Sequence, residues 1–133
     1  EGKIKKQKAL LPITGEEKSF ELAEGWEWAR FQSLPTNYSV GLDRGKSQQA
    51  LDKKFSYFKI NNILNSGGFD LNNIVSIDAS ISEVEQYSLQ SFDLLFNTRN
   101  SKELVGKTCV FQNHVDAPIL YNNNILRAQF SIK

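Results

Sequence analysis

Apolar and polar residues alternate along several stretches of the chain, and each alternation predicts a half-buried β-strand. The longest stretch, residues 75–82, places valine, alanine and isoleucine on one face and serines with Asp78 on the other. Side chains of a strand point alternately to its two faces, so this pattern is typical of a strand with one face in the core. Three further stretches alternate in the same way: residues 37–43, 92–96 and 126–132.

Other apolar stretches predict shorter strands, and polar runs separate them. We expect strands within residues 19–23, 54–60 and 107–113, and one that places Trp26 and Trp28 on a shared face. A loop is predicted over residues 44–54, which are polar and rich in Gln and Ser, and turns or loops over residues 61–73 and 116–124, where Gly, Asn, Asp and Pro gather. Helical periodicity is scarce, and its best stretch is residues 47–54.

Many short strands separated by turn signals predict an all-β fold, mostly antiparallel. We expect an OB-like small barrel, with a β-sandwich or jelly roll as the alternative. A length of 133 residues fits one domain with its own hydrophobic core. We place a flexible basic arm at residues 1–12, rich in lysine and closed by Pro12, and a single β-rich domain at residues 13–133. Because the chain contains no methionine, we expect it to be a piece of a longer protein.

Composition narrows the classes of function. The formal net charge of +1 is not the strongly basic balance of a dedicated duplex-DNA binder. No run of 18 apolar residues is present, so no membrane span is predicted. Cys109 is the single cysteine, which excludes a disulfide within the chain and leans toward a reducing, intracellular compartment.

The residue types that catalysis needs are sparse. His114 is the only histidine, and its odd spacing from Cys109 places the two on opposite faces of a continuous strand. Cys109 is therefore interpreted as a small buried apolar residue. Glu83 and Glu85 share a predicted strand face. They could form a catalytic pair of carboxylates, but a solvated acidic edge is the simpler interpretation. We predict no enzyme activity, no metal site and no cofactor.

Aromatic residues are the stronger candidates for a functional role, as binding residues. Rings beside lysine or arginine can stack bases in a single-stranded nucleic-acid groove, stack sugars or form a protein interface. Core packing is the alternative for each of them. The set comprises Trp26, Trp28, Tyr57, Tyr87, Phe111 and Tyr121.

One segment of the chain resembles a known family of domains. It comprises residues 55–63 (FSYFKINNI), a glycine turn and residues 74–84 (IVSIDASISEV). The segment resembles the entry into an OB-fold of the replication protein A large-subunit type. Residues 104–111 and 122–132 similarly resemble the fourth and fifth strands of such a domain. Two departures stand out, since the usual helix between strands three and four is missing or very short, and the first strand bears no base-stacking aromatic.

The resemblance implies single-stranded nucleic-acid binding across the sheet and its loops. It implies a set of binding residues at Tyr87, Arg99, Lys102, Phe111, Tyr121 and Arg127. The function predicted is thus a non-enzymatic binding module for single-stranded nucleic acid, or a subunit of a complex that binds it. The alternatives are a β-sandwich assembly subunit, with a protein partner or a second copy of the chain, and a carbohydrate-binding domain that uses Trp26 and Trp28.

Overall fold

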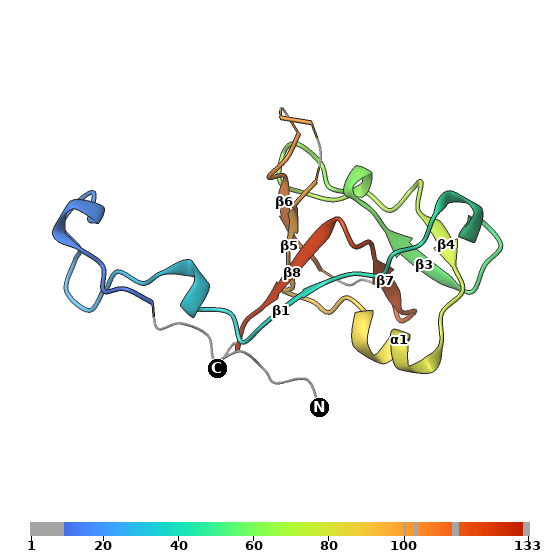
Figure 1. The fold of residues 1–133 in the computed structure, drawn as a ribbon, viewed down its shortest axis with the longest axis horizontal. Helices are drawn as coiled ribbons and strands as arrows, with labels where there is room; N and C mark the ends of the chain where they lie inside the picture. The colour runs from blue at the N-terminus through green and yellow to red at the C-terminus, as the bar shows by residue number, and fades with distance from the viewer. Residues whose placement is uncertain (1–9, 100, 103, 113–114, 132–133) are drawn as a thin grey trace. The chain divides into compact units, whose positions relative to one another are not determined.

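The computed structural model describes residues 10–99, 101–102, 104–112 and 115–131 (Figure 1). Its internal contacts divide the chain into two units, Glu1–Leu34 and Pro35–Lys133, which are described separately below. Most of the predicted basic arm and His114 lie outside the described residues. The boundary predicted at residue 13 stays a prediction.

The first unit, over residues 10–34, is an irregular segment with two short 3-10 turns, η1 (Gly15–Glu17) and η2 (Phe31–Ser33). No strand forms among these residues, so the strands predicted around residues 19–23 and 26–28 are wrong. Gly25 has a φ of +84° in a turn that Trp26 N closes onto Ala23 O, and this turn interrupts the extended chain. A strand also needs a neighbour to pair with, and none is present within this segment.

The second unit contains two four-stranded sheets, ordered β1-β8-β5-β6 and β2-β4-β3-β7 (Figure 1). Every pair of strands is antiparallel except β3 with β7. The prediction of an all-β, mostly antiparallel fold is confirmed. Among the described residues the two sheets do not close into one barrel. The strands are β1 (Asn37–Val40), β2 (Gln49–Ala50), β3 (Phe55–Phe58), β4 (Val75–Ile77), β5 (Leu94–Asn97), β6 (Thr108–Val110), β7 (Ile119–Tyr121) and β8 (Ile125–Gln129).

The core of the second unit is formed by residues of both sheets. Phe58 and Tyr121 from one sheet pack in a cluster with Leu95 and Ile125 from the other, and all four are fully buried. Cys109 joins the same cluster, and its burial raises the pKa of the thiol to about 11. The thiol therefore stays protonated, as expected of a small apolar core residue rather than a nucleophile.

One predicted strand is partly a helix. β4 ends at Ile77, and residues that were expected to continue it form α1 (Ile81–Tyr87). Ser80 caps this helix, because its Oγ accepts a hydrogen bond from Glu83 N while Ser80 N donates to the Glu83 carboxylate. This reciprocal pair is a capping box. Glu83 and Glu85 are therefore helical, and the strand face predicted for them does not exist.

Short 3-10 turns complete the second unit: η3 (Lys46–Gln48) falls in a predicted loop, and η4 (Ile60–Asn62) begins on the last residue of a predicted strand. β2 and β7 lie within residues predicted as loops, so those predictions are wrong for Gln49–Ala50 and Ile119–Tyr121. In the described part of the chain, α1 is the one α-helix, and no helix there has the length and apolar character to cross a membrane.

Candidate nucleic-acid interface

A polar groove of about 340 Å³ opens on the second unit where three loop segments meet. We call it the amide groove, because its side chains include five amides together with three basic groups. The segments that form it are the loop after β1, the start of η4 and the turn between β7 and β8. It is lined by Asp43, Arg44, Gly45, Lys46, Gln49, Lys59, Ile60, Asn61, Asn122, Asn123 and Asn124.

Close approach of two backbones brings these segments together. Leu42 N donates to Tyr121 O at 2.8 Å, and Asn123 N donates to Leu42 O at 2.9 Å. Gly41 makes this approach possible, since a Cβ at that position would overlap Tyr121 O. A side chain cannot be accommodated there without separating the strands, so the groove depends on this glycine.

A buried network fixes the floor of the groove. The Tyr57 hydroxyl donates to Leu42 O at 2.6 Å and accepts a hydrogen bond from Asn122 Nδ2 at 2.7 Å. Burial raises the pKa of Tyr57, so the hydroxyl keeps the proton that this network uses. Asn122 Oδ1 in turn accepts from Asn124 N at 2.9 Å and holds the turn between β7 and β8. The groove is thus preorganised.

Several side chains of the groove are available to a ligand. Within the described part of the chain, the side chains of Lys46, Asn61, Asn123 and Asn124 have no hydrogen-bond or ion-pair partner. Lys46 and Asn61 are exposed, and Asn123 and Asn124 are half-buried. An amide offers a donor and an acceptor in one plane, which matches the edges of a base, and a lysine offers a charge to phosphate.

Three other polar side chains of the groove, Lys59, Gln49 and Arg44, have partners, whereas the exposed Asp43 carboxylate has no hydrogen-bond or ion-pair partner among the described residues. Lys59 Nζ donates to Gln49 Oε1 at 2.8 Å, and Gln49 Nε2 donates to Arg44 O at 2.8 Å. Arg44 pairs with Glu83 of α1 at 2.6 Å. The hydrogen bond from Ser80 N, and then the Arg44 guanidinium, lower the pKa of Glu83, so the pair stays ionised at neutral pH.

Three of the six residues implied by the OB-fold resemblance are buried in the interior of the second unit. Phe111 and Tyr121 are fully buried, and the Tyr121 hydroxyl lies 2.7 Å from Ser39 Oγ. Arg127 is 5% exposed, and its guanidinium donates to Ser88 O at 2.8 Å and to Gln86 O at 3.0 Å. A base could not stack on these rings without opening the core.

The other three implied residues are more accessible. Tyr87 is the last residue of α1 and is half-buried. It packs against the core cluster described above and against a second one of Leu42, Tyr57, Ile77 and Leu120, and its ring centroid lies 6.3 Å from that of Tyr121. Arg99 and Lys102 are exposed in the turn after β5. The structure does not place any of the six in the amide groove. Their role in binding stays a prediction.

Sequence reasoning missed the amide groove. The run Asn122-Asn123-Asn124 signalled only a loop, and the polar stretch after β1 was given no function. The available signal was the amide content of these loops, because Asn and Gln are side chains that can recognise base edges.

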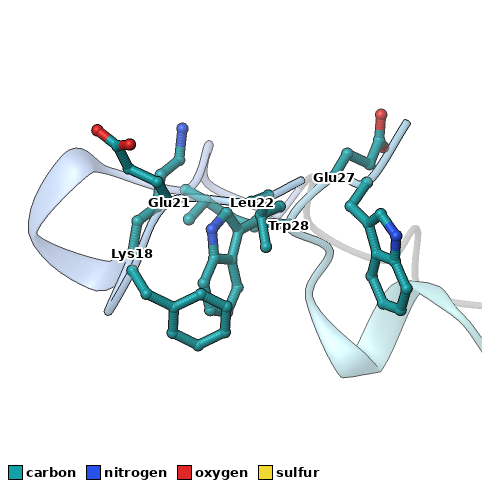
Figure 2. Close-up of a pocket in the computed structure, with 8 residues that line it drawn as sticks. Lys18, Glu21, Leu22, Glu27 and Trp28 are labelled. Carbon is teal, nitrogen blue, oxygen red and sulfur yellow. The ribbon is translucent and has the colours of Figure 1, made fainter. Parts of the chain in front are cut away.

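The first unit has a hollow of its own, which we call the aromatic hollow, of about 910 Å³. Trp26 is 74% exposed, while Trp28 packs against Phe20 with ring centroids 4.9 Å apart. Figure 2 shows the carboxylates of Glu21 and Glu27 on the opposite side of the segment from the Trp28 ring. The two tryptophans do not share a strand face, and the sugar-binding alternative stays a prediction. The hollow is lined by Ile13, Lys18, Phe20, Glu21, Leu22, Trp26, Glu27 and Trp28.

Comparison with known proteins reveals two relatives. The chain is 27% identical over 129 residues to the Type I restriction enzyme EcoEI specificity subunit of Escherichia coli, an alignment that covers 96% of this chain and 21% of that protein. It is also 71% identical over 34 residues to the Type I restriction enzyme EcoAI specificity subunit of Escherichia coli, covering 26% of this chain and 6% of that protein. The chain therefore spans about a fifth of the EcoEI relative's length. No family model matches it.

Proposed function

We propose that the chain is a non-enzymatic nucleic-acid-binding module of a larger restriction complex, and that the amide groove is its contact surface. The observation that carries this proposal is the groove itself, where a free lysine lies among unpartnered amides on a preorganised floor. Similarity to two specificity subunits supports a role in recognition rather than cleavage. DNA is the polymer to test first, since restriction is the cutting of DNA.

Lys46 would contact phosphate, and the asparagines would contact base edges. Phosphate contacts position a protein on nucleic acid, whereas contacts to base edges supply the preference for sequence. Loss of one phosphate contact weakens binding for all sequences alike and reduces the salt slope by about 1. Loss of an amide that reads a base costs about 1–3 kcal/mol and relaxes the preference at one position.

The test is fluorescence anisotropy of a labelled DNA oligonucleotide, as duplex and as single strand, titrated with the full chain at several salt concentrations. We expect Lys46→Ala to weaken binding and flatten the salt dependence. Lys18→Ala, in the first unit, is the matched control and should bind like the parent chain. Tighter binding of the single strand than of the duplex would support the expectation from the OB-fold resemblance.

Two results would contradict the proposal. Absence of binding to either form at low salt would exclude a nucleic-acid role for this chain, because the electrostatic contribution is strongest there. Binding that survives Lys46→Ala unchanged but is lost in Lys102→Ala would move the site from the amide groove to the turn after β5, where the resemblance implied it.

Residues 10–34 support a second function, contact with a protein partner. They carry five glutamates against one lysine and one arginine, and they expose Phe20, Trp26 and Phe31. An acidic segment repels phosphate, while carboxylates and exposed aromatic rings each suit the arginine and lysine side chains of a basic protein surface. The aromatic hollow is thus proposed as a docking site for a basic segment.

Tryptophan fluorescence tests this second function directly, because both tryptophans lie in the first unit. A peptide of alternating Arg and Leu should change the emission of the chain, and a peptide of alternating Glu and Leu is the control. Trp26→Ala should reduce the affinity for the basic peptide. Equal responses to the two peptides would contradict a docking site selective for basic segments.

A further inference from the structure

Phe92 adopts a backbone conformation that an aromatic residue rarely takes. Its φ is +73°, and it is the one residue other than glycine with a positive φ among those the structure describes. It occupies a tight turn in which Asp93 N donates to Gln90 O at 3.1 Å and Gln90 N donates to Asp93 Oδ2 at 2.9 Å. Glycine or asparagine is the usual residue at such a position, because a Cβ is strained there.

Packing of the side chain does not explain why a phenylalanine occupies this position. Its ring is 56% exposed, so burial offsets little of the backbone strain. The backbone itself is held firmly, since Phe92 N donates to Phe111 O at 2.7 Å. A strained turn that presents an aromatic ring to solvent is a feature that binding sites use.

Phe92 lines a mostly polar pocket of about 340 Å³, which we call the Phe92 pocket. A second ring, that of the half-buried Phe130, lines it as well, together with Thr36, Gln90, Gln129 and the buried Asp93. Among the described residues the Gln90 side-chain amide has no partner, whereas Gln129 Nε2 is committed to Asp93 Oδ1 at 3.0 Å.

Charge at the pocket is balanced. Asp93 is the single charged residue of its lining, and Arg127 Nη1 lies 3.8 Å from Asp93 Oδ2 beneath it. Both side chains are almost entirely buried. Among the described residues, no free cation lines this pocket to hold a phosphate. The ligand that fits two aromatic rings and one free amide is neutral, planar and bordered by hydrogen-bonding groups.

We propose that the Phe92 pocket takes one unstacked nucleobase, with the Phe92 ring against its face and the Gln90 amide at its edge. This inference rests on the proposed nucleic-acid function and adds a second contact, separate from the amide groove. Stacking on an exposed ring tolerates any base, and a single amide at the edge adds a preference. The strained turn holds the ring in place before the base arrives.

The decisive variant is Phe92→Gly in the full chain, probed with a single-stranded DNA oligonucleotide that carries 2-aminopurine. Glycine takes a positive φ without strain, so the variant should unfold at the same temperature as the parent chain or higher. Its affinity for the oligonucleotide should nevertheless fall about tenfold, and the quenching of 2-aminopurine by stacking should be lost. Phe92→Trp should restore both.

Two results would overturn the inference. If Phe92→Gly binds and quenches like the parent chain, the ring does not contact a base. If Phe92→Gly unfolds at a clearly lower temperature, the ring serves packing and the strain has a structural explanation. Lys46→Ala separates this inference from the function on which it rests, because weaker binding in that variant alone would leave the amide groove in place and reject the Phe92 pocket.

Discussion

In the second unit Tyr57 and Phe111 are fully buried, whereas in the first unit Trp26 keeps 74% of its surface exposed. No residue among 10–34 is buried, so hydrophobic packing contributes little to the order of that segment. The same residue types therefore have different surroundings in the two units. In the second unit aromatic rings stabilise the fold, and in the first unit most of them stay exposed.

Two arginines show the same contrast. Arg127 is buried beside Asp93 and donates to two backbone carbonyls of the segment 86–88. Arg30 is partly exposed, donates to Leu11 O and contacts both carboxylate oxygens of Glu17 at 3.0 Å. A buried pair that loses one partner leaves an uncompensated charge, while an exposed pair is replaced by water.

The largest effect is expected from Arg127→Ala, which removes the cation beside the buried Asp93 carboxylate and the donors to Gln86 O and Ser88 O. We expect the free energy of unfolding of the second unit to fall by about 3–5 kcal/mol, measured by urea denaturation followed by circular dichroism. Arg30→Ala is the matched control and should leave that transition where it is. Equal shifts in the two variants would contradict the expectation that the buried arginine stabilises the second unit more than the exposed arginine does.

Gly41→Ala should have the next largest effect. The added Cβ would overlap Tyr121 O and force the backbones apart, which costs about 1–3 kcal/mol or more. Gly15→Ala provides the control, because a Cβ there meets nothing within 4 Å. Denaturation midpoints of the two variants should differ clearly. An unchanged midpoint for Gly41→Ala would mean that the segments forming the amide groove are not held as closely as the structure shows.

The smallest effect concerns pH in the first unit. The hydrogen bond from Arg30 is the main cause that lowers the pKa of Glu17 to about 2. Because the folded carboxyl has the lower pKa, the Arg30–Glu17 pair contributes fully above pH 4.5 and is lost as the pH falls toward 2. Titration of the Glu17 carboxyl carbon by NMR should show this low midpoint, and Arg30→Ala should return it to the usual range. A midpoint near 4.5 in the parent chain would show that the pair does not form.

Alternation predicted where strands lie but not which side chains are buried. β1 and β4 lie within alternating stretches and β8 overlaps one, yet Val40 on a predicted apolar face is exposed and Arg127 on a predicted polar face is buried. β7 was missed because Ile119, Leu120 and Tyr121 are all buried, so its sequence does not alternate. α1 was missed because Ile81 continues an alternating run, although Ser80 and Glu83 already have the spacing of a helix cap.

The candidate sites were harder to predict for a different reason. The amide groove joins segments that are far apart in the sequence, and they meet only because Gly41 lets two backbones touch. The Phe92 pocket depends on a positive φ, which the sequence Ser91-Phe92-Asp93 does not signal. Aromatic rings attracted attention in the sequence, yet burial decides which of them a ligand can reach.

One NMR measurement tests the central claim, that the second unit binds nucleic acid through the amide groove while the first unit does not. The full chain, labelled with nitrogen-15, is titrated with a DNA oligonucleotide. We expect the side-chain amide signals of Asn61, Asn123 and Asn124 to shift while the indole signal of Trp26 stays in place. Shifts at the Trp26 indole with unchanged groove amides would contradict it.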